Sequence, residues 1–304
     1  MHRLLRKFTR HALPTGAAQK CFNCSSALET FTQSGQAASF LQDPAGSLCL
    51  YNSMKQDNPE KNLWLFPAPE TSGAAFRLFC FPHAGGGASV FRQWQSHMPA
   101  QVQVCSVQLP GRENRMNEQA CLVLSHLVER IFTGLYHLFD VPFAFFGHSL
   151  GAKIAFELAR CAQQNKLPLR CLLVAASRAP HIREPRPLHH LPDQLFLQEL
   201  RRYSATPEAL LANQELMAVF LPLLRADFTL DETYTFQAGP PLACPLYVYG
   251  GEEDQDITLE ELSAWRQHAS GSFVLRMFPG GHFFIKSAAD RLLVQLNADL
   301  GALI

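Results

Sequence analysis

The stretch 143–151, F-A-F-F-G-H-S-L-G, decides the fold, because it is typical of a buried strand that turns abruptly into a helix. An apolar run ends at Gly147, and residues 152–164 continue with helical periodicity. The turn carries a G-x-S-x-G pattern, which places a serine on a strained bend with its side chain projecting from the sheet. Only glycine leaves room for the backbone two positions before and after that serine. We therefore predict that Ser149 is a nucleophile.

Short apolar runs alternate with helical segments on both sides of this stretch, as parallel βαβ units require. Each predicted strand except 172–176 is followed by a proline or a glycine turn. The predicted strands are 76–81, 102–108, 143–146, 172–176, 246–249 and 273–278, and the predicted helices are 121–139, 152–164 and 260–268. The pattern predicts an α/β protein with a mostly parallel central sheet flanked by helices.

A serine hydroxyl needs a base to remove its proton, and in this type of fold the base is a histidine later in the chain. His282 is the best candidate, because it follows a strand and a glycine turn near the end of the domain. His148 adjoins the serine and is expected to point away from its hydroxyl. His189 and His190 lie in a proline-rich loop and are expected to be solvated.

A carboxylate should orient this histidine and should precede it in the chain. The run G-G-E-E-D at 250–254 directly follows a predicted strand, so its carboxylates lie at the carboxyl edge of the sheet. Asp254 is the favoured acid. Glu252, Glu253 and Asp256 are alternatives that are more simply explained as exposed loop charges.

An oxyanion hole needs two hydrogen-bond donors near the serine. The backbone amide of Leu150, directly after the serine, is the first candidate. The second comes from the loop 81–87, F-P-H-A-G-G-G, where Ala84 is favoured and His83 is the alternative. This glycine-rich loop lacks the Gly-Lys-Ser/Thr of a phosphate-binding P-loop.

Composition limits the classes of protein that this chain can be. Its 304 residues are 47% hydrophobic and 17% charged, which supplies a large core and excludes disorder as the main state. A formal net charge of +0 argues against nucleic-acid binding, and no apolar run is long enough for a membrane span. Nine cysteines, an odd number, indicate free thiols in a reducing compartment, so we expect a cytoplasmic protein.

Residues 1–53 differ from the rest of the chain. They begin with a basic segment that lacks acidic residues, and a polar stretch typical of a cytosolic start opens at Met54. We expect either a disordered extension or an artefact of the assigned start, with an organelle transit peptide as a third alternative. Cys21 and Cys24 have C-x-x-C spacing, but without further ligands nearby they form a poor zinc site.

Six motifs taken together resemble those of the type II thioesterases, stand-alone α/β-hydrolases that act beside fatty acid, polyketide and nonribosomal peptide synthases. The resemblance covers residues 62–300 and excludes 1–53. The motifs are F-P-H-A-G-G-G at 81–87, L-P-G-R-E-N-R at 109–115, F-F-G-H-S-L-G at 145–151, L-R-A-D at 224–227, A-W-R-Q-H at 264–268 and F-P-G-G-H-F-F at 278–284.

The resemblance implies an α/β-hydrolase fold and release of acyl groups from the phosphopantetheine arm of a carrier protein. Ser149 would take the acyl group, His282 would act as base and then as acid, and Asp254 would hold the imidazole. The resemblance also implies that the protein is a monomer and that it binds no metal and no cofactor. The same triad would also suit an oxoester hydrolase or an acyltransferase, and a non-catalytic binding protein is a more distant alternative.

The resemblance also implies that an insertion at about 181–240 forms a lid over the serine. Helical, apolar pieces at 191–203, 207–212 and 215–228 occupy this insertion. We expect Phe220 and Leu224, together with His83, to line an apolar channel for the acyl chain, although the same apolar residues would suit simple packing of the lid. Before the lid, Arg178, Arg183 and Arg186 are expected either to steer an acidic carrier protein or to form a solvated loop.

Overall fold

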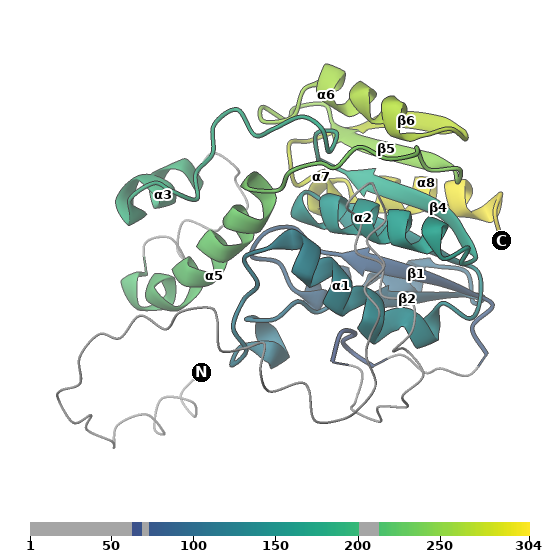
Figure 1. Cartoon of the computed structure of the whole chain (residues 1–304), viewed down its shortest axis with the longest axis horizontal. Helices are drawn as coiled ribbons and strands as arrows, with labels where there is room; N and C mark the ends of the chain where they lie inside the picture. Colours follow the sequence, from purple (N-terminus) through teal and green to yellow (C-terminus); the bar gives the residue numbers. More distant parts are fainter. Residues whose placement is uncertain (1–62, 69–72, 201–212) are drawn as a thin grey trace, which may run out of the picture. The chain divides into compact units, whose positions relative to one another are not determined.

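The computed structural model describes residues 63–68, 73–200 and 213–304 (Figure 1). The predictions for residues 1–53, including Cys21 and Cys24, lie outside the described residues, as does the predicted helix at 207–212. Within the described ranges, strands and helices alternate along the chain as the sequence predicts.

The core of the fold is a six-stranded sheet in which every neighbouring pair of strands is parallel. The strand order across the sheet is β2-β1-β3-β4-β5-β6. The strands are β1 (Phe76–Phe81), β2 (Val102–Ser106), β3 (Phe143–His148), β4 (Leu169–Ala175), β5 (Leu246–Gly251) and β6 (Phe273–Phe278). The predicted α/β class, with a parallel central sheet flanked by helices, is confirmed.

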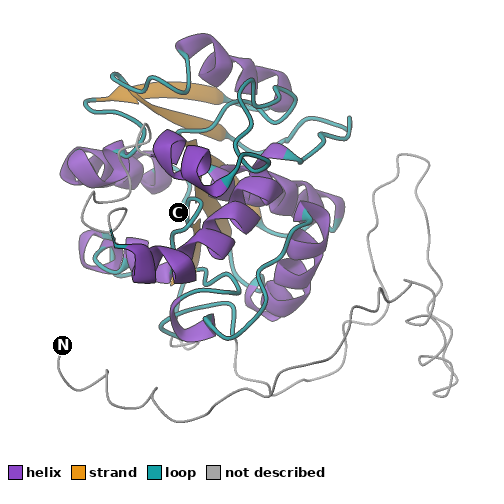
Figure 2. Ribbon diagram, turned by 90° about the vertical axis from the view of Figure 1, so that its left-hand side faces the viewer, coloured by secondary structure: helices purple, strands orange, loops and turns teal. Residues whose placement is uncertain are grey.

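Helices cover both faces of this sheet, which is why its strands are apolar on both sides. Phe79 and Phe81 of β1 pack in one cluster with α1 (Leu124–Leu135) and α2 (Leu150–Gln164). Leu78 and Cys80 of the same strand pack on the opposite face with α8 (Ala289–Gly301) and two short 3₁₀ helices. Figure 2 shows the strands with helices on either side.

Strand register brings the loops that follow the strands together at one edge of the sheet. Phe81 at the end of β1 is paired with Gly147 of β3, and His148 is paired with Ala175 at the end of β4. Gly251 at the end of β5 is likewise paired with Phe278 of β6. The segments after these strands, which contain the predicted site residues, therefore begin side by side.

Among the described residues between β4 and β5, in the predicted insertion, lie the helices α3 (Asp193–Leu200) and α5 (Gln214–Glu232). They share a small apolar cluster of their own, made of Leu188, Phe196, Leu200, Met217 and Leu224. Asn213 caps α5 by accepting a hydrogen bond from the amide of Leu216 at 3.1 Å. Figure 1 places α5 beside the end of the sheet where the loops gather.

Several element boundaries differ from the predicted ones. β2 ends two residues early, because Val107 instead forms an antiparallel bridge with Leu65. α5 continues through Pro222 to Glu232. The remaining described α-helices are α6 (Leu259–Ser263) and α7 (Phe284–Ser287). None of the helices in the described ranges has the length and apolar character needed to cross a membrane.

Candidate active site

Ser149 lies on the sharp turn between β3 and α2. Its backbone has a φ of 55° and a ψ of −119°, a conformation that non-glycine residues rarely adopt. A Cβ on Gly147 would overlap the carbonyl oxygen of Gly151, and a Cβ on Gly151 would overlap that of Phe81. The two glycines therefore let α2 start directly against the sheet, and the strained bend presents the serine hydroxyl to the pocket.

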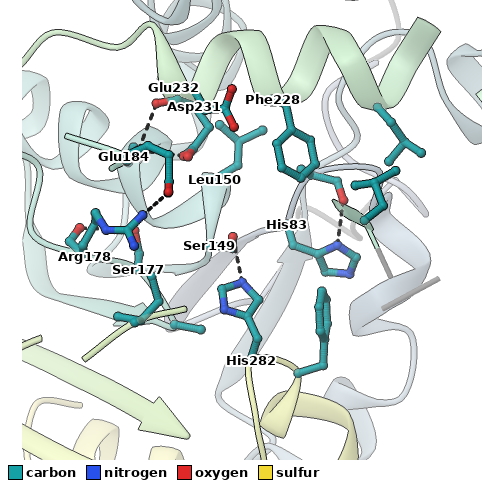
Figure 3. Close-up of a pocket in the computed structure, with 17 residues that line it drawn as sticks. His83, Ser149, Leu150, Ser177, Arg178, Glu184, Phe228, Asp231, Glu232 and His282 are labelled. Atoms are coloured by element: carbon teal, nitrogen blue, oxygen red, sulfur yellow. Dashed lines mark hydrogen bonds and ion pairs between the residues drawn. The ribbon is translucent and has the colours of Figure 1, made fainter. Parts of the chain in front are cut away.

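The structure brings His282 and Asp254 to this serine from two different loops. Nε2 of His282 lies 3.1 Å from Oγ of Ser149 (Figure 3). Nδ1 of the same ring lies 3.0 Å from Oδ2 of Asp254. An ionised carboxylate can only accept hydrogen bonds, so Nδ1 carries the proton and Nε2 is free to accept the serine proton. The arrangement therefore suits removal of the hydroxyl proton by the imidazole.

The Asp254 carboxylate is almost fully buried and is held by more than the histidine. Its Oδ1 accepts hydrogen bonds from the amides of Asp256 and Ile257 at 2.9 and 3.3 Å. Burial acts to raise the pKa of Asp254, but its hydrogen bond and charge interaction with His282 and the two amides bring that pKa below its usual value. The group therefore stays ionised. Glu252 and Glu253 are exposed as expected, whereas the Asp256 side chain is buried, contrary to the expectation.

His148 points away from the serine, as predicted, and contacts the backbone of His282. It is fully buried, and its Nε2 donates a hydrogen bond of 2.8 Å to the carbonyl oxygen of His282. Burial, together with the neighbouring His282 and His83, lowers the pKa of His148 well below its usual value. This ring is therefore neutral, and its hydrogen bond fixes the backbone of His282.

The two predicted oxyanion donors both line the pocket next to Ser149. Leu150 begins α2 and Ala84 follows β1 in the loop 81–87. Within the described part of the chain, neither backbone amide donates to a protein acceptor. Nδ1 of His83 bonds to the Ala84 carbonyl at 2.9 Å, and burial lowers the pKa of His83 to about 4, so this ring is also neutral.

The pocket above Ser149 has about 740 Å³ of space between its walls, including space open to solvent. Figure 3 shows Phe228 and His83 on one side of Ser149, and Arg178 and Glu184 on the other. Leu224 lines the pocket as expected. Phe220 is not part of the pocket lining, because it packs in the apolar cluster of α3 and α5.

The pocket is not the wholly apolar channel expected from the sequence, because five charged residues line it: Lys153, Arg178, Glu184, Asp231 and Glu232. Lys153 and Asp231 form a 2.9 Å ion pair in the wall, and the buried Glu232 accepts hydrogen bonds from the backbone and side chain of His189. His189 is therefore bound to the protein and is not simply solvated. His190 is exposed, as predicted.

Arg178 also differs from its prediction, because it faces inward. Its guanidinium pairs with Glu184 and with Glu261, and it donates to the carbonyl oxygen of Asp256 at 2.7 Å. Only Arg183 and Arg186 of the three predicted arginines are exposed at the surface.

Sequence patterns did not identify Lys153, Asp231, Arg112 or Asp227 as site residues. Lys153 comes four positions after Ser149, one turn along the same helix, and this spacing was the available signal for a pocket-facing lysine. Arg112 and Asp227 lie in two of the quoted motifs, L-P-G-R-E-N-R at 109–115 and L-R-A-D at 224–227, which were the available signal for them. No group of three or more potential metal ligands occurs among the residues that the structure describes.

Comparisons with known proteins agree with this geometry. A family model described as "Thioesterase domain" matches residues 76–300. The gramicidin S biosynthesis protein GrsT of Aneurinibacillus migulanus is 44% identical over 227 residues, covering 74% of this chain and 88% of GrsT. The RedJ thioesterase from the prodiginine pathway of Streptomyces coelicolor aligns with a TM-score of 0.72 at 37% identity, covering 76% of this chain and 93% of RedJ. The type II thioesterase BorB of the borrelidin cluster aligns with a TM-score of 0.71 at 34% identity, covering 80% of this chain and all (100%) of BorB.

Proposed function

The chain belongs to the thioesterase family and is a hydrolase of thioesters, and we propose that it releases acyl groups from the phosphopantetheine arm of a carrier protein. The relatives GrsT, RedJ and BorB are named for the biosynthesis of gramicidin S, prodiginine and borrelidin. We infer that the partner of this chain belongs to a nonribosomal peptide or polyketide pathway. Editing of stalled acyl groups, or release of a product, is the proposed role.

In the proposed reaction, Nε2 of His282 takes the proton from Ser149 as Oγ attacks the thioester carbonyl carbon. The carbonyl oxygen becomes an oxyanion and receives hydrogen bonds from the amides of Ala84 and Leu150. When the tetrahedral intermediate collapses, the carbon–sulfur bond breaks and the pantetheine sulfur leaves with the proton from His282. An acyl-serine ester remains.

Water completes the cycle by the same steps. His282 removes a proton from water as the water oxygen attacks the acyl-serine carbonyl, and it then returns that proton to Oγ of Ser149. Asp254 stabilises the positively charged imidazole that exists during each step. The carboxylic acid product leaves, so the net reaction consumes one water and yields one acid and one thiol. No cofactor takes part in the proposed mechanism.

The observation that carries this proposal is the continuous chain of hydrogen bonds from Asp254 through His282 to Ser149, at 3.0 and 3.1 Å, in a chain that matches the thioesterase model. A monomeric state and a cytoplasmic location remain predictions. The exposed Arg183 and Arg186 are proposed to face an acidic carrier protein, and Arg178 no longer belongs to this surface.

The test compares one acyl group on three leaving groups: a loaded carrier protein, free pantetheine and p-nitrophenol. Thiol or phenol release is measured for the wild type and for Ser149→Ala. We expect the highest kcat/KM with the carrier protein, and a charge reversal of Arg183 and Arg186 should raise KM for that substrate alone. A preference for the p-nitrophenyl ester would favour an oxoester hydrolase, and acyl transfer to an added alcohol in place of water would favour an acyltransferase.

A further inference from the structure

Asp227 is a fully buried carboxylate on α5 that reaches across to the loop containing the Ala84 amide. Its Oδ2 accepts a hydrogen bond from the backbone amide of Gly85 at 2.7 Å. The same oxygen accepts from Nη1 of Arg112 at 2.7 Å, and Oδ1 accepts from Nη2 at 2.8 Å. One side chain therefore joins the helix in the insertion to two loops at the edge of the sheet.

Arg112 is itself buried and uses its whole hydrogen-bonding capacity in this arrangement. Its Nη1 donates to the carbonyl oxygen of Gly86 at 3.1 Å, and Nε and Nη2 donate to that of Pro110 at 3.3 and 3.2 Å. Together with the two bonds to Asp227, these contacts employ all five N–H groups of a guanidinium. Arg112 therefore has no N–H group left to donate to a ligand, which favours a structural role for the pair.

The loop held by this pair has little freedom of its own. Gly85 has a φ of 74°, and a Cβ at this position would lie 2.5 Å from Cδ2 of Leu224 on α5. The amide of Gly86 donates to the carbonyl oxygen of His83 at 2.9 Å, which closes a tight turn around Ala84. The Ala84 amide therefore lies inside a turn whose next amide, that of Gly85, is fixed by Asp227.

We propose that Asp227 is a positioning residue that aims the Ala84 amide at the reacting carbonyl oxygen, so that this oxyanion donor depends on the docking of α5. The inference rests on the proposed function, because it presumes that Ala84 donates to an oxyanion on the acyl carbon of Ser149. A buried ion pair is a costly way to join two elements, and apolar residues can often replace one without loss of stability. Its directional bonds, in contrast, specify where the Gly85 amide lies.

The direct test is Asp227→Asn, which keeps the shape of the side chain but removes its charge and one acceptor oxygen. Displacing a donor by a fraction of an ångström weakens stabilisation of the transition state more than binding of the substrate. We expect kcat with an acyl-pantetheine thioester to fall about 10- to 100-fold, with KM changed less than twofold. The affinity for an alkyl trifluoromethyl ketone, which forms an oxyanion on the serine, should fall by a similar factor, whereas that for the matching methylene analogue should not change.

Asp193→Asn is the matched control, because it removes the 2.6 Å ion pair between Asp193 and Arg225 of the same helix α5, away from the loop. Its kcat and ketone affinity should match the wild type. Arg112→Lys provides a second variant that keeps a positive charge near Asp227 but loses the fork that holds Gly86 and Pro110. Arg112→Lys should lower kcat and the affinity for the ketone by a smaller factor than Asp227→Asn does. It decides the question if Asp227→Asn does not fold.

Two results would overturn the inference: wild-type kcat in a folded Asp227→Asn or Arg112→Lys protein, or a loss of kcat with unchanged affinity for the ketone. Failure of the proposed function gives a different result, because the wild-type protein itself would then not hydrolyse the acyl thioester, with or without binding of the ketone.

Discussion

Nε2 of His148 donates a 2.8 Å hydrogen bond to the backbone carbonyl oxygen of His282, so the residue before the nucleophile holds the backbone of the base. This contact joins the end of β3 to the loop after β6, which are 134 positions apart in the chain. Burial keeps the His148 ring neutral, and only a neutral ring leaves the nearby imidazole of His282 free to carry the charge that develops in catalysis.

We predict that His148→Phe lowers kcat about tenfold and leaves KM nearly unchanged, because the loss of this hydrogen bond loosens the position of His282 relative to Ser149. His148→Gln, whose side-chain amide can still donate, should recover most of the loss. Steady-state kinetics with an acyl-pantetheine substrate would measure both effects. Equal kcat values for the Phe and Gln variants would show that the hydrogen bond is not what matters.

Gly147 offers a test of the strained turn. We predict that Gly147→Ala destabilises the protein by several kcal/mol, since the new Cβ would overlap the backbone of Gly151 and force α2 away from the sheet. Urea unfolding measures the change in the free energy of unfolding. Gly301→Ala at the end of α8 is the control, because a Cβ there meets nothing within 4 Å and should change stability by less than about 0.5 kcal/mol. Similar stabilities for the two variants would contradict the account of the turn.

Stability should fall as pH falls, because several histidines are buried in the neutral form. Burial lowers the pKa of His268 to about 4, and its neighbours His181 and Arg160 act in the same direction. An unfolded histidine takes up a proton near pH 6.5, whereas the buried His268 takes one up only near pH 4. The stability that the neutral, buried ring contributes is therefore complete above pH 6.5 and is lost as pH falls from 6.5 towards 4. Each such group changes the free energy of unfolding by up to about 1.4 kcal/mol per pH unit.

The corresponding experiment measures the free energy of unfolding at pH 7 and pH 5 for the wild type and for His268→Gln. The variant, which has no ring to protonate, should lose less stability between the two pH values, by up to about 2 kcal/mol. An identical loss in both proteins would mean that His268 does not contribute.

The charged wall of the pocket predicts a preference for short or polar acyl groups. A long alkyl chain would lie against Lys153 and Asp231 without replacing the water that these charges attract. The double variant Lys153→Met with Asp231→Leu should raise kcat/KM for a dodecanoyl thioester relative to an acetyl thioester about tenfold. A panel of acyl-pantetheine substrates measures this ratio.

Arg160→Met with Glu157→Leu is the control for that experiment. It removes an ion pair of 3.0 Å on the same helix α2, outside the residues that line the pocket. Its acyl preference should stay at the wild-type ratio, and an equal shift in both double variants would contradict the role of the pocket wall.

The sheet was predictable from sequence because its strands are short apolar runs and most of them are followed by glycine or proline. Five of the six predicted strands start at the first residue of the observed strand, and 76–81 and 273–278 match at both ends. The sixth, 172–176, starts inside β4 and ends one residue beyond it. α8 was not predicted, although Leu292, Leu293, Leu296 and Leu300 follow a helical spacing.

The serine, acid and histidine were predictable because the order of elements fixes which loops meet at the carboxyl edge of the sheet. The contacts that the insertion between β4 and β5 makes with the sheet loops were not predictable. Asp227 and Arg112 are 115 positions apart, and no local pattern says that α5 lies against the loop after β2. The charged character of the pocket likewise depends on how Asp231 and Glu184 are placed in space, which periodicity does not encode.

The account depends most directly on Ser149 being a nucleophile that His282 activates. The decisive measurement treats the native protein with a fluorophosphonate, locates the adduct by peptide mass spectrometry and follows thiol release from an acyl-pantetheine thioester in parallel. We predict one adduct per chain on the peptide that contains Ser149, loss of hydrolysis in proportion to labelling, no adduct in Ser149→Ala, and slow labelling in His282→Ala. Labelling of Ser149→Ala at the wild-type rate, or a folded wild-type protein that hydrolyses thioesters without being labelled, would contradict the account.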